Sequence, residues 1–192
     1  GGAVPSLLVV PASLIGNWKQ ELARFGPQLR TCYAHHSEVD AAMLDGLAKD
    51  PARALADVDV VVTTYTFVRK QDWVRDTRWR LVVLDEAQAI KNAGSAQAKV
   101  VKQLQATARI VLTGTPVENQ LGDLWSLFDF CNPGLLGSAR EFQQLVKRLE
   151  KQLDAGAYGA LRRLVRPYIL RRMKTDPNIV ADLPEKTEMR AD

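Results

Sequence analysis

Two neighbouring acids, Asp85 and Glu86, directly follow the apolar run Leu81–Leu84. Where an apolar strand ends in two carboxylates, the first can hold Mg²⁺ through the water shell of the metal, and the second can orient an attacking water molecule. This is the arrangement of the Walker B motif. Two acids at a strand end can also cap the next helix or face solvent, and the pair taken alone favours that second interpretation.

Polar residues follow three further apolar runs in the same way. In a parallel α/β sheet, ligand sites collect where the strands end at their carboxyl edge. Polar signatures at several strand ends therefore predict that one edge of a sheet is lined with functional groups. With the acids included, the signatures are Pro11–Ser13, Thr63–Tyr65, Asp85–Gln88 and Thr113–Pro116.

The elements that must position these groups are short apolar runs rich in β-branched residues, each followed by a turn and a helical pattern. Strands that alternate with helices predict an α/β fold with a mainly parallel sheet and helices on both faces. The expected strands are Leu7–Val10, Val58–Thr64, Leu81–Leu84 and Ile110–Thr113, with a weaker one at Leu29–Ala34.

The pattern changes in the last part of the chain. Residues 139–166 are predicted to form two helices rich in Lys and Arg, Ala139–Leu153 and Tyr158–Val165, as a small helical protrusion from the sheet domain. Residues 1–139 carry 14 Lys+Arg and 14 Asp+Glu, whereas residues 140–192 carry 12 and 8, which accounts for the net charge of +4. A basic face beside a neutral core suits a polyanionic partner, although a solvated helical face explains the charge equally well.

Composition excludes several classes of protein. Hydrophobic residues make up 46% and charged residues 25% of the chain, which is ordinary for a folded domain and argues against disorder. No apolar run approaches the ~20 residues that span a bilayer, so no membrane partner is expected. Cys32 and Cys131 lack the spacing of a zinc site or a disulfide scaffold, which favours a reducing compartment.

The residues after the acid pair decide between its two interpretations. The segment Asp85–Asn92, which reads Asp-Glu-Ala-Gln-Ala-Ile-Lys-Asn, strongly resembles motif II of the Swi/Snf family within helicase superfamily two. Further segments resemble other motifs of that family, in the family's order. They are Val10–Trp18 (motif Ia), Val61–Tyr65 (motif Ib), Leu112–Asn119 with Leu124–Phe128 (motif III and its extension), and Tyr168–Lys174 with Leu183–Thr187, which resemble the segment after the first helical protrusion.

The resemblance implies a division into parts. Residues 1–134 would form the first RecA-like lobe, residues 135–166 the helical protrusion, and residues 167–192 a return segment to the lobe or a linker toward a second lobe. A Walker A loop reads GxxxxGK[ST], and no Gly-Lys dipeptide occurs in this sequence. In the family that loop lies upstream of motif Ia, so we expect it to be truncated here and the isolated fragment to be inactive.

The resemblance also assigns roles to individual residues. Asp85 and Glu86 would be catalytic, with Asp85 holding Mg²⁺ through water and Glu86 activating the attacking water. The implied cofactors are ATP and Mg²⁺. The remaining residues of the implied site are Gln88, Thr113, Thr115 and Arg171 toward the nucleotide, and Ser13, Asn17, Thr64 and Lys91 toward DNA.

Simpler structural explanations stay open for several residues. Ser13 could cap the helix that follows it, and Thr64 could be an ordinary strand residue. Trp18, Trp125 and Phe128 recur at the spacing of a buried helix face, so we interpret them as packing residues rather than as residues that stack on bases.

The function that the resemblance implies is that of the first motor lobe of an ATP-dependent double-stranded-DNA translocase or remodeller. Its implied partners are double-stranded DNA, the second RecA-like lobe of the same chain and a DNA-bound protein. The Asp-Glu-Ala-Gln variant is frequent among prokaryotic members, which implies a cytoplasmic, nucleoid-associated location. One alternative is a strand-separating or RNA-directed helicase of the same superfamily, which Trp125–Phe128 and the Lys91–Asn92 continuation disfavour. The other is a non-catalytic DNA or protein interaction module derived from such a lobe.

Overall fold

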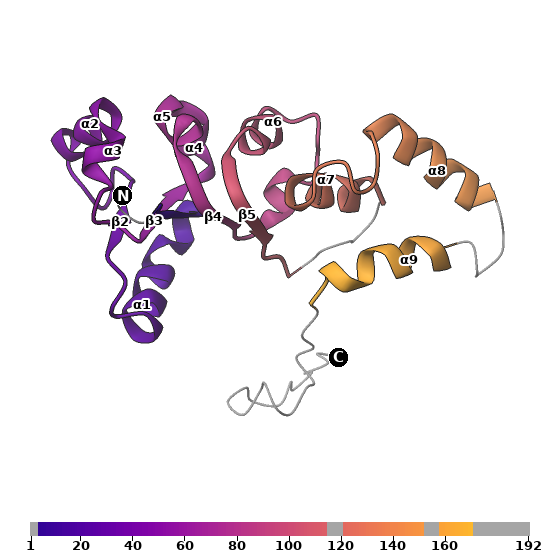
Figure 1. Cartoon of the computed structure of the whole chain (residues 1–192), viewed down its shortest axis with the longest axis horizontal. Helices are drawn as coiled ribbons and strands as arrows, with labels where there is room; N and C mark the ends of the chain where they lie inside the picture. The colour runs from indigo at the N-terminus through magenta and orange to yellow at the C-terminus, as the bar shows by residue number, and fades with distance from the viewer. Residues whose placement is uncertain (1–3, 115–120, 152–157, 171–192) are drawn as a thin grey trace, which may run out of the picture. The chain divides into compact units, whose positions relative to one another are not determined.

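The computed structural model describes residues 4–114, 121–151 and 158–170, and it contains a five-stranded sheet in the order β2-β3-β1-β4-β5 (Figure 1). Each pair of neighbouring strands in this sheet is parallel. The strands are β1 (Ser6–Val10), β2 (Thr31–Tyr33), β3 (Val60–Thr64), β4 (Arg78–Leu84) and β5 (Gln105–Val111).

Helices occupy most of the connections between these strands and the part of the chain that follows β5. Three of the helices between β2 and β4 have only four to six residues, so their sequence shows no helical period long enough to be recognised. The helices are α1 (Ile15–Phe25), α2 (Ala41–Lys49), α3 (Pro51–Ala54), α4 (Tyr65–Lys70), α5 (Asp72–Asp76), α6 (Ala96–Lys102), α7 (Leu121–Cys131), α8 (Ala139–Lys151) and α9 (Gly159–Val165), with 3-10 helices η1 (Ala12–Leu14), η2 (Ala87–Ile90) and η3 (Arg166–Tyr168).

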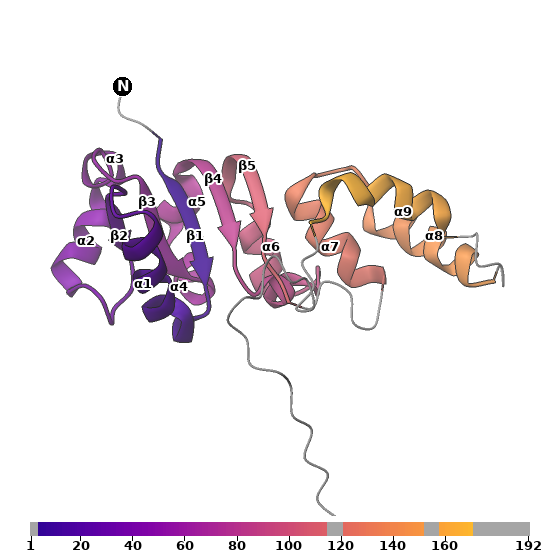
Figure 2. The same ribbon diagram turned by 90° about the horizontal axis from the view of Figure 1, so that it is seen from below.

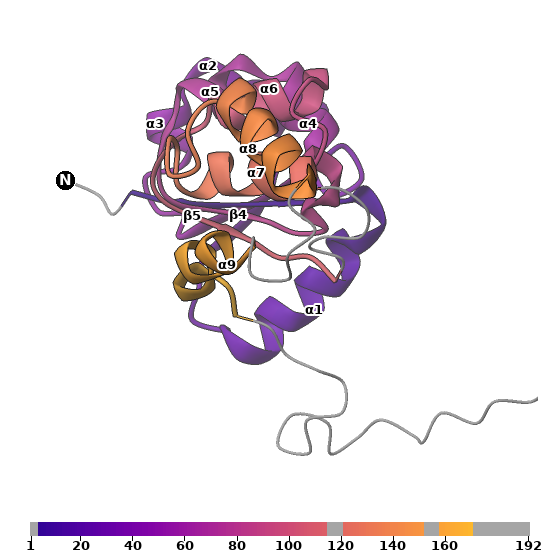
Figure 3. The ribbon, with the colours of Figure 1, turned by 90° about the vertical axis from the view of Figure 1, so that its right-hand side faces the viewer.

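The central strand β1 is apolar along its length because it is covered on both faces. Successive side chains of a strand point to opposite faces. Leu7 and Val9 accordingly pack in the larger core, whereas Leu8 and Val10 pack with Ile15 of α1. Figure 3 shows α1 on one face of the sheet and α4 and α6 on the other. The predicted α/β fold, with a parallel sheet and helices on both faces, is confirmed.

The two strands that carry charged residues begin earlier than predicted. In the first part of β4, exposed Arg78 and Arg80 alternate with fully buried Trp79, so no apolar run marks its start. The prediction of a strand at Ile110–Thr113 is wrong in its bounds, since β5 covers Gln105–Val111. β5 lies at the edge of the described sheet, and its side chains are exposed or half-buried, which explains the weak apolar pattern.

The chain divides into two compact units, Gly1–Val146 and Lys147–Asp192. The helix α8 starts at the predicted residue, and α9 lies within the second predicted helical segment. In α9, Arg162 and Arg163 are exposed. Among the residues that the structure describes, no helix is both long and apolar enough to cross a membrane.

An exposed ion pair beside the sheet gives the fold a testable pH dependence. The carboxylate of Asp59 accepts hydrogen bonds from the side chain of Arg30 (Nε at 3.0 Å) and from its backbone N–H (2.9 Å). These bonds lower the pKa of Asp59 to about 2. Because the folded state holds the ionised form, the stabilisation is present above the ordinary carboxyl pKa and is lost as the pH falls toward 2.

We expect Asp59→Asn to lower the urea midpoint at pH 7, and we expect its difference from the wild type to shrink as the pH falls below about 4. Asp57→Asn is the matched control. Its carboxylate also lies 3.0 Å from Arg30, but the Asp57 side chain is 92% exposed, so a smaller effect is expected. A difference for Asp59→Asn that stayed constant between pH 7 and pH 3 would contradict this account.

Candidate functional site

The ends of β1, β3, β4 and β5 meet at one edge of the sheet, which we call the carboxyl edge. The strand registers pair Val10 with Thr64, and they pair Leu84 with both Val9 and Val111. In Figure 2 the arrowheads of β1, β4 and β5 accordingly lie at the same end. The polar segments that follow these strands therefore emerge side by side.

Asp85 is held at the carboxyl edge by residues from several elements. Its side-chain Oδ2 accepts a hydrogen bond from Trp18 Nε1 of α1 at 2.7 Å, and Oδ1 accepts one from the backbone N–H of Glu86 at 2.8 Å. The Tyr65 hydroxyl donates to the Asp85 carbonyl at 2.7 Å, and the Asp85 N–H donates to the Val9 carbonyl at 2.9 Å. Both carboxylate oxygens and both backbone groups of Asp85 are thus fixed.

Tyr65 is a suitable donor for this position because it stays protonated. Burial raises the pKa of the Tyr65 hydroxyl, and the negative charges of Asp85 and Glu86 raise it further. The tyrosine is itself placed by the start of α4, where the Thr64 hydroxyl accepts the Phe67 N–H at 3.2 Å as a helix cap.

Glu86 has an unusual backbone conformation. Its φ and ψ angles of 48° and 52° lie in the left-handed region, and it is the single non-glycine residue with positive φ among those described. This conformation costs about 1–2 kcal/mol for a residue with a side chain. It turns the chain sharply between β4 and η2, so the two acids follow the strand without continuing its direction.

A hydrogen-bond chain joins Glu86 to the end of β5. Gln88 Nε2 donates to Glu86 Oε2 at 2.6 Å, and the Thr113 hydroxyl donates to Gln88 Oε1 at 3.1 Å. The backbone follows the same path, since Leu112 pairs with Leu84 and the Ala87 N–H donates to the Leu112 carbonyl. Sequence reasoning named these three side chains but did not reveal that Gln88 bridges the other two.

The residues predicted to face DNA fall into two groups. Ser13 and Asn17 are exposed, in η1 and α1 respectively. Helix α1 begins without a side-chain cap, so the alternative in which Ser13 caps it is wrong. Lys91 is half-buried, with Nζ 3.8 Å from the Asp123 carboxylate. Thr64 is only 4% exposed and its hydroxyl caps α4, which leaves little of this side chain for a DNA contact.

The remaining predicted residues either take part in packing or lie outside the described residues. Trp18 packs with the cluster around Ile15, as predicted, although its N–H also bonds to Asp85. Trp125 Nε1 donates to the Gly137 carbonyl at 3.0 Å, and Phe128 is buried. Thr115 and Arg171 lie outside the described residues.

The donor set of the carboxyl edge fits Mg²⁺ better than a transition metal. Mg²⁺ takes oxygen ligands and is commonly bound through one or two carboxylates, water and substrate phosphates rather than by a cage of protein side chains. Asp85 and Glu86 supply such carboxylates. In the described part of the chain, no group of three or more His, Cys, Asp or Glu side chains could enclose a metal.

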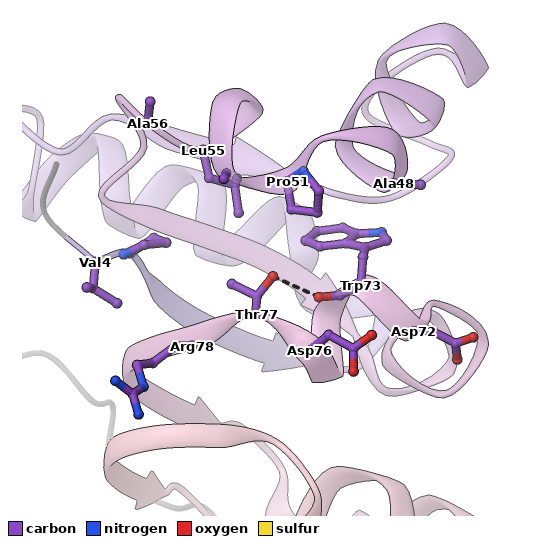
Figure 4. A pocket seen from close by; sticks show the side chains of 12 residues that line it. Val4, Ala48, Pro51, Leu55, Ala56, Asp72, Trp73, Asp76, Thr77 and Arg78 are labelled. Atoms are coloured by element: carbon purple, nitrogen blue, oxygen red, sulfur yellow. Dashed lines mark hydrogen bonds between the residues drawn. The ribbon is translucent and has the colours of Figure 1, made fainter. Parts of the chain in front are cut away.

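A cavity of about 790 Å³ lies elsewhere in the molecule. It is lined by residues at the starts of β1 and β4 and by parts of α2, α3 and α5, among them Pro5, Pro51, Trp73 and Arg78. Figure 4 shows the Trp73 ring beside Pro51. With about 3.3 Å per strand residue, the seven residues of β4 place this cavity roughly 20 Å from Asp85, so we do not assign it to the same site.

The fold and the carboxyl edge are those of a RecA-like α/β lobe. Residues 1–191 match the family model of the SNF2-related domain, and the chain belongs to that family. It is 38% identical over 186 residues to the putative ATP-dependent helicase/translocase YwqA of Bacillus subtilis, covering 96% of this chain and 20% of that protein. It is also 38% identical over 198 residues to the TATA-binding protein-associated factor MOT1 of Saccharomyces cerevisiae, covering 96% of this chain and 10% of MOT1.

A solved structure of the same family is also similar to the chain. The Sulfolobus solfataricus SWI2/SNF2 ATPase core in complex with dsDNA is 39% identical to the chain, with a TM-score of 0.77. The likeness covers 94% of this chain and 36% of that core. The chain thus spans about a third of the solved core and a fifth or less of the two curated relatives.

Proposed function

We propose that the chain is the part of an ATP-dependent double-stranded-DNA translocase that carries the Mg²⁺-binding and water-activating acids. The observation that supports this most is the position of Asp85 and Glu86 on the same sheet edge as the exposed polar residues of η1 and α1. The relative from Bacillus subtilis bears the name of a helicase/translocase, and the solved relative is described with dsDNA.

The proposed chemistry assigns separate tasks to the two acids. Mg²⁺ bound with ATP would neutralise the negative charge of the phosphate oxygens while the terminal phosphoryl group is transferred to water. Asp85, fixed through both carboxylate oxygens, would hold the water shell of the metal, and Glu86 would orient the attacking water and accept its proton. Gln88 and Thr113 hold the Glu86 carboxylate through the hydrogen-bond chain, which limits its rotamers. Thr115 and Arg171 would complete the nucleotide side.

The proposed nucleic-acid contacts are to the DNA backbone. Hydroxyl, amide and ammonium groups that contact phosphates position a protein on DNA without reading the base sequence. Ser13, Asn17 and Lys91 offer such groups at the carboxyl edge, where Thr64, whose hydroxyl caps α4, ends β3. Exposed Arg162 and Arg163 of α9 supply further positive charge for an anionic partner.

The wider assignments form part of the same proposal. Residues 1–134 would act as the first RecA-like lobe, residues 135–166 as a helical protrusion, and residues 167–192 as a return segment or as a linker to the second lobe. The partners would be double-stranded DNA, that second lobe and a DNA-bound protein. Action on chromosomal DNA would place the protein in the cytoplasm with the nucleoid.

The decisive experiment compares two assays on the full-length protein. Double-stranded DNA is expected to stimulate ATP hydrolysis, and ATP is expected to drive displacement of a triplex-forming strand without separation of the duplex strands. Efficient duplex separation would favour the strand-separating helicase. No hydrolysis with any DNA would favour the non-catalytic interaction module.

We expect the chain to bind duplex DNA weakly, without sequence preference, and with an affinity that falls steeply as salt rises, because phosphate contacts release counterions. Lys91→Gln is expected to reduce the slope of log affinity against log salt by about one. Arg53→Gln is the control, since exposed Arg53 of α3 lies away from the carboxyl edge. Fluorescence anisotropy on two duplexes of unrelated sequence measures both quantities. An affinity that is insensitive to salt would contradict the proposed contacts.

A further inference from the structure

One hydrogen bond at the carboxyl edge directly joins the element that is proposed to contact DNA to the acid that is proposed to hold Mg²⁺. Trp18 Nε1 lies 2.7 Å from Oδ2 of Asp85, a residue 67 positions away in the sequence. Trp18 belongs to α1, and its neighbour Asn17 is exposed on the same helix, as is Ser13 in the turn before it. The indole therefore connects the element proposed to contact DNA with the carboxylate proposed to hold the metal.

The character of this hydrogen bond makes it more than a packing contact. Its acceptor is a carboxylate oxygen and both partners are half-buried, and hydrogen bonds to carboxylates are shorter and stronger than those between neutral groups. Phenylalanine or leucine at position 18 would fill the same apolar cluster with Ile15 and Leu22. The N–H group is the part of the side chain that packing does not require.

We infer that Trp18 is a positioning residue through which a displacement of α1 on DNA binding changes the orientation of the Asp85 carboxylate. This inference rests on the proposed function. The backbone of Asp85 is tied to β1 through the Val9 carbonyl and to α4 through the Tyr65 hydroxyl. These bonds hold the backbone of Asp85, whereas its Oδ2 is held to α1 through the indole. A shift of α1 by about 1 Å would therefore lengthen that bond beyond hydrogen-bonding distance and leave Oδ1 bonded to the Glu86 N–H.

Trp18→Phe in the full-length protein tests the coupling, and Trp125→Phe is its matched control. Both substitutions remove an indole N–H hydrogen bond from a half-buried ring, but Trp125 donates to the Gly137 carbonyl rather than to an acid. We expect Trp18→Phe to lower the ratio of DNA-stimulated to DNA-free ATP hydrolysis about tenfold. Its affinity for DNA in the absence of nucleotide should change by less than about twofold. Trp125→Phe should leave the ratio unchanged.

A second readout does not depend on hydrolysis. In protein labelled with fluorotryptophan, the fluorine resonance of Trp18 is assigned by its loss in Trp18→Phe. Duplex DNA is expected to shift this resonance in the wild type. In Asp85→Asn, whose neutral amide is a weaker acceptor, the resonance of the DNA-free protein is expected to move toward the DNA-bound position.

The outcomes separate this inference from the proposed function. If DNA stimulates hydrolysis by the wild type, but Trp18→Phe keeps the wild-type ratio or DNA leaves the Trp18 resonance in place, the coupling through Trp18 is wrong and the proposed function stands. If DNA stimulates no hydrolysis by the wild type, the proposed function fails. If Trp18→Phe does not fold, the Trp18 resonance is assigned in the wild type as the one that changes in Asp85→Asn. Whether duplex DNA shifts that resonance then decides whether Trp18 couples DNA binding to Asp85.

Discussion

Glu86→Gln is expected to reduce ATP hydrolysis by the full-length protein by at least about a hundredfold. The amide has the shape of the carboxylate, but it cannot accept the proton of the attacking water. Glutamine also tolerates the left-handed backbone at this position about as well as glutamate, so the turn between β4 and η2 should persist. Release of inorganic phosphate under saturating ATP and DNA measures the effect.

The control for this variant is an acid of the same type away from the carboxyl edge. Glu38 pairs with Lys19 at 2.7 Å, and Glu38→Gln should leave the rate of hydrolysis within about twofold of the wild type. Binding of ATP by Glu86→Gln should persist, because Asp85 is unchanged. A rate for Glu86→Gln within tenfold of the wild type would show that another group activates the water.

Trp79→Ala is expected to destabilise the chain by about 3–5 kcal/mol. Trp79 is fully buried in β4, and its Nε1 donates to the Val74 carbonyl at 2.8 Å. The substitution removes the largest fully buried side chain, leaves a cavity in the core and deprives the Val74 carbonyl of its donor. The free energy of unfolding, measured by urea titration followed by circular dichroism, gives the size of the loss.

Two further variants separate the causes of that loss. Trp79→Phe retains most of the buried ring but removes the donor, so it should cost less than the alanine variant. Phe25→Ala truncates an aromatic residue that is 70% exposed at the end of α1, and it should change the stability by no more than about 0.5 kcal/mol. Equal losses for Trp79→Ala and Phe25→Ala would contradict the description of the core.

The parts of the fold that the sequence predicts well are those buried on both sides. β1 and β3 contain uninterrupted apolar runs, Leu7–Val10 and Val60–Val62, because helices cover both faces of the sheet there. The predicted position of β5 lies too late in the chain because the side chains of this strand are exposed or half-buried at the edge of the described sheet, so its first residues look like a loop. The helices α3, α4 and α5 have four to six residues each, too few to show a helical period.

The candidate site was predictable in its residues but not in its contacts. Strand ends indicated where Asp85, Glu86 and Thr113 would lie, because parallel strands share a carboxyl edge. The periodicity that identified Trp18 as a packing residue could not reveal its second role. One signal was present: a tryptophan on a buried face carries an N–H that needs an acceptor, and the nearby acids were candidates. Nothing in the sequence indicates the left-handed backbone of Glu86, because the residue at this position is not a glycine.

The unfavourable backbone of Glu86 bears on how such a domain could be engineered. A glycine at this position would relax the turn, although it would remove the acceptor of the Gln88 hydrogen bond, so a search that rewarded only resistance to heat would include this replacement among its candidates. The same replacement would delete the side chain on which the proposed hydrolysis depends. Thermostable versions of this lobe are therefore better sought with position 86 held constant.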